Sequence, residues 1–187
     1  MKFEYARISG SLFQQEYSFS RAQEYVEMAI YSAIAFSLPF IFGHEQLLVG
    51  SVVNCALVLA ALNLKGARLL PVIILPSIGA YLAGLIFGVA SPALLYMIPF
   101  IWMGNALLVL CIKYLVFDKK TNRVAALGIG AAAKAAFLFL SALALLTFGM
   151  VPAAFLAAMG IFQLATALLG GSAALALQAG KKRFAGA

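Results

Sequence analysis

Long apolar stretches separated by short polar or turn-forming segments make up most of this chain. A helix that crosses a hydrocarbon core roughly 30 Å thick needs about 20 mostly apolar residues, and six stretches approach or exceed that length. The sequence therefore predicts membrane helices over residues 25–42, 47–64, 69–88, 93–116, 124–148 and 152–177. The connections are short and contain breakers or charge, so consecutive helices should be antiparallel.

Lysine and arginine predict the orientation of these helices. They precede the first stretch and follow the second, fourth and sixth, whereas the three other connections contain none. Because cytoplasmic loops carry the positive excess, both termini should be cytoplasmic. The expected protein is an all-α membrane protein with six transmembrane helices: residues 1–24 form a cytoplasmic or interfacial N-terminal segment, 25–178 the six-helix domain and 179–187 a basic cytoplasmic tail.

Composition supports a membrane location and excludes several functions. Of the 187 residues, 65% are hydrophobic and only 10% are charged, a balance foreign to soluble domains. The net charge of +7 lies in the tails and alternate loops rather than on one solvated face, so no nucleic-acid partner is expected. The first 24 residues are polar and mixed in charge, which predicts no cleaved signal peptide.

The sequence offers no recognisable catalytic or metal site. Cys55 and Cys111 are isolated within apolar runs, so packing is the expected role of each. No paired nucleophile and base, no phosphate-binding loop and no H-E-x-x-H motif is present, which predicts a protein that is not an enzyme and needs no cofactor. His44 and Glu45 lie in a short outer loop, but two ligands make a poor metal site.

Four polar residues lie within predicted helices, at a similar depth. At a rise of about 1.5 Å per residue, each falls roughly 10 to 20 Å from the outer end of its helix. Such residues usually face the interior of the bundle or a wet cavity, and an apolar cavity with a few polar groups is typical of a small-molecule site. The predicted substrate-binding residues at this depth are Asn54, Asn105, Lys134 and Gln163.

Lys134 is the most informative of the four because no carboxylate lies at its depth. An unpaired buried ammonium must lose its proton, reach water or bind an anionic or carbonyl-rich group. The alternative is a structural lysine bonded to helix carbonyls and to amides such as Asn105, and each amide can equally join helices. Tyr96 and Trp102 could stack on a planar ligand, although aromatic side chains near an interface are ordinary.

Small residues four apart predict two faces for close helix packing. One is Ala29-x-x-x-Ala33 in the first predicted helix, and the other is Ala80-x-x-x-Gly84-x-x-x-Gly88 in the third. Packing within the bundle is the simpler interpretation of both.

Several stretches resemble the S components, the substrate-binding membrane subunits of energy-coupling-factor (ECF) transporters. The resemblance spans most of residues 25–177 and rests on QLLVGSVVN (46–54), LPSIGAYLAGLIFG (75–88), IPFIWMGN (98–105) and QLATALLGG (163–171). It implies six helices with both termini inside, which agrees with the orientation predicted from the charges.

The resemblance also implies a function, partners and interfaces. An S component binds a vitamin, a precursor or a similar micronutrient in an outward-facing pocket, which loops 43–46, with His44, Glu45 and Gln46, and 89–92 would close here. It then topples in the cell membrane on a transmembrane coupling protein that carries two ATPase subunits. Ala29 and Ala33 match the motif that contacts this coupling protein. The early histidine of nickel and cobalt members is missing, and Lys134 favours an organic substrate that can be anionic.

Two other functions remain open from the sequence. A small membrane scaffold or assembly protein would bind no small molecule, and its Asn54, Asn105, Lys134 and Gln163 would face one another and fill the space between helices. An intramembrane enzyme or a gradient-driven transporter would usually need more titratable groups at mid-depth than one lysine.

Overall fold

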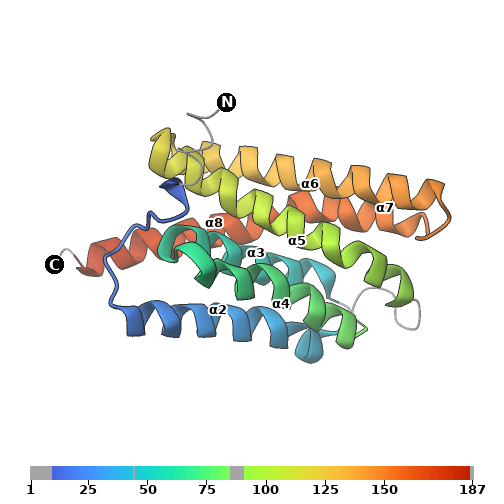
Figure 1. The fold of residues 1–187 in the computed structure, drawn as a ribbon, viewed down its shortest axis with the longest axis horizontal. Coiled ribbons are helices and arrows are strands. Elements are labelled where there is room, and N and C mark those ends of the chain that lie inside the picture. Colours follow the sequence, from blue (N-terminus) through green and yellow to red (C-terminus); the bar gives the residue numbers. More distant parts are fainter. Residues whose placement is uncertain (1–9, 44, 85–90, 186–187) are drawn as a thin grey trace.

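The structure, a computed structural model, describes residues 10–43, 45–84 and 91–185, without the side chains of 91–92 and 182–185. Every regular element in these residues is helical (Figure 1). The elements are α2 (Arg21–Phe42), α3 (Gln46–Asn63), η1 (Gly66–Arg68), α4 (Leu69–Leu82), α5 (Ser91–Lys113), η3 (Tyr114–Asp118), α6 (Arg123–Thr147), α7 (Ala154–Met159) and α8 (Ile161–Ala185).

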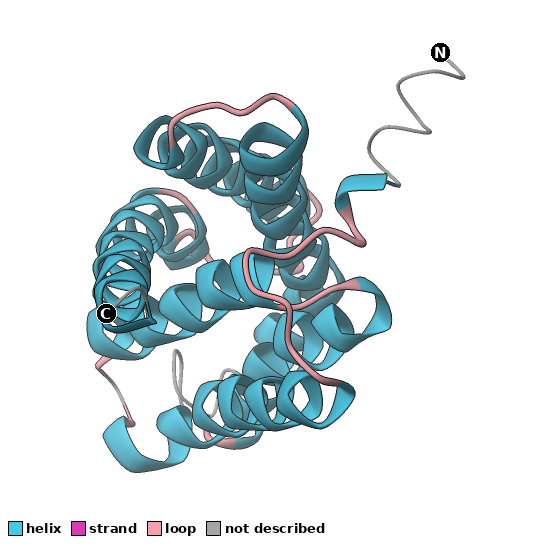
Figure 2. Cartoon of the chain, turned by 90° about the vertical axis from the view of Figure 1, so that its left-hand side faces the viewer, coloured by secondary structure: helices cyan, strands magenta, loops and turns pink. Residues whose placement is uncertain are grey.

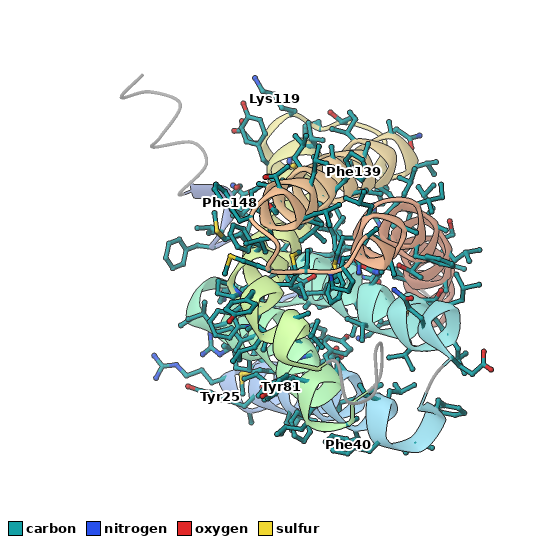
Figure 3. All side chains as sticks on the ribbon, turned by 90° about the vertical axis from the view of Figure 1, so that its right-hand side faces the viewer. Tyr25, Phe40, Tyr81, Lys119, Phe139 and Phe148 are labelled. Atoms are coloured by element: carbon teal, nitrogen blue, oxygen red, sulfur yellow. The ribbon has the colours of Figure 1, made fainter. Side chains whose placement is uncertain are left out.

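The helices indicate a multi-pass membrane protein, as predicted. Five of them are long and apolar enough to cross a bilayer: α2, α3, α5 with η3, α6, and α7 continued by α8. The helical segment Gly66–Leu82, which contains α4, is apolar but shorter. Large apolar side chains cover the outside of the bundle, with Phe40 52% and Phe148 78% exposed (Figure 3). A surface of this kind is stable against lipid rather than water.

The helix ends follow local chemistry more closely than they follow hydropathy. Ser20 caps α2 in a capping box with Gln23, so this helix begins four residues before the predicted boundary at residue 25. α4 ends at Leu82 rather than at residue 88, because Gly84 has a φ of 64°, outside the right-handed helical region. Residues 85–90 lie outside the described residues. The last predicted helix is broken at Gly160, between α7 and α8.

The central helix is α3, which packs against α2, α4, α5 and α8. Its closest neighbour is α8: a Cβ atom built on Gly170 would lie 1.9 Å from the backbone oxygen of Ser51. α4 approaches α2 in a similar way, because a Cβ on Gly79 would lie 2.3 Å from the oxygen of Phe36. Glycine permits such approach of two backbones in lipid. These two close contacts do not involve the predicted faces, which were Ala29 with Ala33 and Ala80 with Gly84 and Gly88. Gly88 lies outside the described residues.

Residues 10–19 cross the end of the bundle at which α2 begins and α8 ends (Figure 2). Backbone groups of this segment form three hydrogen bonds to the bundle: Gly66 N to Leu12 O at 3.0 Å, Glu16 N to Leu62 O at 2.8 Å, and Lys113 Nζ to Gln14 O at 2.6 Å. The Lys113 side chain is fully buried beneath it. We call residues 10–19 the strap, because it connects α3, η1 and α5 across this end.

All four ion pairs within the described residues lie at the strap end of the bundle. Glu24, only 2% exposed, accepts Lys65 at 3.1 Å and Arg68 at 2.5 Å. The others are Glu16 with Arg123 at 2.6 Å and Glu27 with Lys181 at 2.9 Å. Basic residues of three predicted cytoplasmic segments, Lys65 with Arg68, Arg123, and Lys181, thus share one end of the structure.

Replacing Glu16 by glutamine should loosen the strap. The Glu16 carboxylate accepts hydrogen bonds from Arg123 at 2.6 Å and from the buried Gln178 at 2.8 Å. A neutral amide loses the charge assistance of both contacts, so we expect a loss of about 1–3 kcal/mol in unfolding free energy. Thermal unfolding of the detergent-solubilised protein measures it, with the exposed Glu45→Gln as control. Equal midpoints for the two variants would show that Glu16 does not anchor the strap.

Candidate functional site

A cavity of about 70 Å³ lies among α3, α4, α5, α6, α7 and α8. Most of its wall is apolar, with polar side chains at a few points, as in many small-molecule sites. The volume accommodates several water molecules or a compact chemical group. The polar residues that line it are Gln46, Asn54, Ser77, Asn105, Lys134 and Gln163. The four residues predicted at one depth therefore surround a single cavity.

Lys134 contributes the only charged side chain among the described residues of the cavity wall. It lies near the middle of α6 and is 2% exposed. Its Nζ donates a hydrogen bond to Asn54 Oδ1 at 2.7 Å, which is its one protein partner within the described part of the chain. An ammonium has three N–H donors, so two of them are left for water or a ligand.

Asn54 is held in one orientation by its own hydrogen bonds. Its Nδ2 donates to Gly50 O at 2.9 Å and to Thr166 Oγ1 at 3.1 Å. Both amide hydrogens are thereby used, so Oδ1 faces Lys134 and can only accept. Thr166 in turn donates to Phe162 O at 2.8 Å. A continuous chain of hydrogen bonds thus connects α6 through α3 to α8 and fixes the position of the lysine head.

Close packing of α3 and α8 makes this chain of bonds possible. A Cβ on Gly50 would lie 2.8 Å from Thr166 Cγ2, so only glycine lets the threonine sit beside Asn54 without a shift. Thr166 was not predicted as a site residue. It follows Gln163 by three positions on the same face of a helix, and this polar spacing in an apolar helix was the available signal.

The polar groups of α5 bind mainly to α4. Asn105 Nδ2 donates to Ile73 O at 3.0 Å, and Trp102 Nε1 donates to Ser77 Oγ at 2.7 Å and to Ile74 O at 3.1 Å. These acceptors surround Pro76, whose ring leaves one carbonyl of α4 without its usual helical partner. Trp102 therefore contacts α4 and does not line the cavity. Ser77 does line it, and the sequence interpretation missed it.

The two glutamines lie toward the other end of the cavity. Gln46 begins α3 and donates weakly, at 3.4 Å, to Ala158 O. The side chain of Gln163 lines the cavity without a hydrogen bond to any other described residue. Its amide can therefore donate to and accept from a molecule in the cavity.

The remaining predicted site residues lie elsewhere. Tyr96 is 47% exposed and does not line the cavity. Glu45 is exposed at the start of α3, and His44, like residues 89 and 90 of loop 89–92, lies outside the described residues. Ala29 and Ala33 are exposed on the outer face of α2, where no described residue covers them. The described residues contain no cluster of three or more potential metal ligands.

Comparison with known proteins adds no assignment to this geometry. Neither protein-family models, nor curated proteins, nor solved structures gave a match to this chain. The residues of the cavity and the resemblance of the four sequence stretches remain the grounds for assigning a function.

Proposed function

We propose that this chain is the substrate-binding membrane subunit of an ECF-type importer in the cell membrane. It captures a small molecule from outside and delivers it through a transmembrane coupling protein with two ATPase subunits. In this proposal α4 also crosses the membrane, which brings the number of crossings to six, and both termini are cytoplasmic. The observation that carries the proposal is the cavity, in which a buried lysine and three amides from separate helices converge.

The unused hydrogen-bonding capacity of the cavity favours a binding protein over a scaffold. A scaffold needs its buried polar groups to satisfy one another and to fill the space, because unpaired groups in lipid are costly. Here the buried Lys134 has one protein acceptor among the described residues, the side chain of the half-buried Gln163 has no partner there, and a cavity separates the helices around them. A bound molecule would complete these hydrogen bonds.

The position of the cavity supports capture from outside. The basic residues and the strap lie at one end of the bundle, which the positive-inside rule assigns to the cytoplasm. The cavity wall includes Gln46 at the first turn of α3 and Met159 at the α7–α8 break, both near the opposite end. A molecule at Lys134 would thus lie deeper in the bundle than these residues, on the outer side of the strap.

A binding screen tests the proposed function directly. Purified protein is heated with vitamins, their precursors and transition metal ions, and we expect one compound to raise the unfolding midpoint saturably. The Ala80→Leu variant fills part of the cavity from the α4 wall and should remove that shift while remaining folded. If no compound stabilises the wild type, the result favours a membrane scaffold over a substrate-binding protein.

The transport part of the proposal has its own readout. Membrane vesicles from the native cell should accumulate the stabilising compound only with ATP, and vesicles lacking this chain should not. Accumulation by the isolated chain, driven by an ion gradient alone, would instead support a gradient-driven transporter.

A further inference from the structure

Lys134 provides unused hydrogen-bond donors at the deep end of the cavity. Asn54 Oδ1 is occupied by Lys134, and both N–H groups of Asn54 are bound to protein. Two donors of Lys134 remain for a ligand, beside the acceptor capacity of the amide oxygens of Asn54 and Asn105. A ligand that accepts hydrogen bonds satisfies the lysine, which an ammonium or other pure donor cannot do.

The charge of Lys134 also favours a ligand that accepts hydrogen bonds. Among the described residues that line the cavity, Lys134 is the one ionisable side chain. The described carboxylates, Glu16, Glu24, Glu27, Glu45 and Asp118, belong to the strap, the helix ends or the loops, and none pairs with it. In surroundings of low dielectric an uncompensated ammonium attracts an anion strongly and repels a cation.

The polar groups of the cavity lie at two different depths. Asn54 and Lys134 lie near the middle of α3 and α6, whereas Gln46 and Gln163 begin or nearly begin their helices. Apolar residues such as Val53 and Ile101 line the wall between these polar groups. A ligand with one acceptor head and a less polar body would match this layout, with its head at Lys134 and its body toward the glutamines.

We infer that the molecule captured in this cavity is a carboxylic acid whose carboxylate binds Lys134. The inference rests on the proposed function and narrows it from small molecules in general to carboxylates with a compact head. Asn54 acts as a positioning residue, since it holds the lysine through Oδ1 and is itself held by Gly50 and Thr166.

Matched pairs of compounds test the inference. Nicotinate is compared with nicotinamide, biotin with biotinamide, lipoate with lipoamide, and pantothenate with panthenol, with thiamine as a cation. Each is titrated by calorimetry against the full-length protein in detergent. We expect one acid to bind at least about tenfold more tightly than its neutral counterpart, the usual effect of one charge-assisted hydrogen bond.

Two lysine variants assign the preference to a residue. Lys134→Met should abolish the preference for the acid, whereas Lys113→Met, which removes another buried lysine beneath the strap, should retain it. A preference that survives in Lys134→Met would overturn the inference. The wild-type comparison remains decisive if a variant fails to fold.

The other outcomes separate this inference from the proposed function. Binding of a neutral or cationic compound in preference to every acid would overturn the inference that the ligand is a carboxylic acid. It would leave the proposed importer function in place. If no compound in the panel binds, both are overturned and the cavity is structural.

Discussion

Replacing Gly170 by alanine is expected to destabilise the protein more than any other single methyl group added to a helix. The new Cβ would lie 1.9 Å from Ser51 O and 2.8 Å from Cys55 N, two backbone atoms that cannot rotate away. α3 and α8 would have to separate, and overpacking of this kind costs typically 1–3 kcal/mol even where side chains can yield. Less monodisperse protein after detergent extraction and a lower unfolding midpoint would measure the effect.

Gly128→Ala provides the matched control. A Cβ at Gly128 would meet nothing within 4 Å, although this residue too lies inside a helix. Alanine there should be neutral or stabilising by up to about 1 kcal/mol, because glycine is the poorer helix former. If both glycine variants behaved like the wild type, α3 and α8 would not approach as closely as the structure indicates.

Separation of α3 from α8 should also affect the site. Thr166 and Gly170 occupy the same face of α8, and Thr166 holds Asn54, which in turn holds Lys134. A shift of α8 would therefore lengthen the bond between Asn54 and Thr166 before it changed the cavity wall. The small residues of this seam thus connect the stability of the bundle to the geometry of the cavity.

Hydropathy was sufficient to predict an all-α chain with several membrane-length apolar helices, but not where each helix ends. A membrane helix is recognised by its length and composition, which depend on many residues at once. The end of α4 depends on the backbone conformation of Gly84 alone, and the break before α8 on Gly160. An apolar run continues through both positions, so composition carries no signal of either.

The contacts of the strap were not predictable for a different reason. The sequence predicted a cytoplasmic or interfacial segment over residues 1–24 and left open where residues 10–19 bind the bundle. Three of the bonds that hold them use backbone groups of the strap, and the side chain of Glu16 adds bonds to Arg123 and Gln178. Backbone acceptors are present at every residue, so no pattern of side chains predicts which ones are used.

The depth of the polar residues was predictable, but their partners were not. Asn54, Asn105, Lys134 and Gln163 line one cavity because antiparallel helices with a constant rise place equivalent positions at equal depth. The direction in which each side chain points depends on how its helix is rotated, which the sequence leaves open. Asn105 and Trp102 illustrate this, since both donate to carbonyls of α4. That these residues bind a substrate stays a prediction.

Replacing Asn54 by aspartate is expected to remove the affinity of the cavity for acids. The substitution keeps the shape of the side chain but places a carboxylate where Oδ1 lies 2.7 Å from Lys134 Nζ. Lys134 would then have a permanent counter-ion, and a ligand carboxylate would meet a site without net positive charge. We expect the dissociation constant of the preferred acid to rise by about 10- to 100-fold, the range set by a charge-assisted hydrogen bond.

The aspartate variant also separates recognition from stability. It loses the donors to Gly50 O and Thr166 Oγ1 but gains a buried ion pair, so the protein should remain folded while its ligand preference disappears. Asn63→Asp is the control, because Asn63 is an equally buried amide at the strap end, bonded to Tyr31 and Gln178 rather than to the cavity. Calorimetric titration of the same acid against both variants makes the comparison. Unchanged acid binding in Asn54→Asp would mean that the charge of Lys134 does not select the ligand.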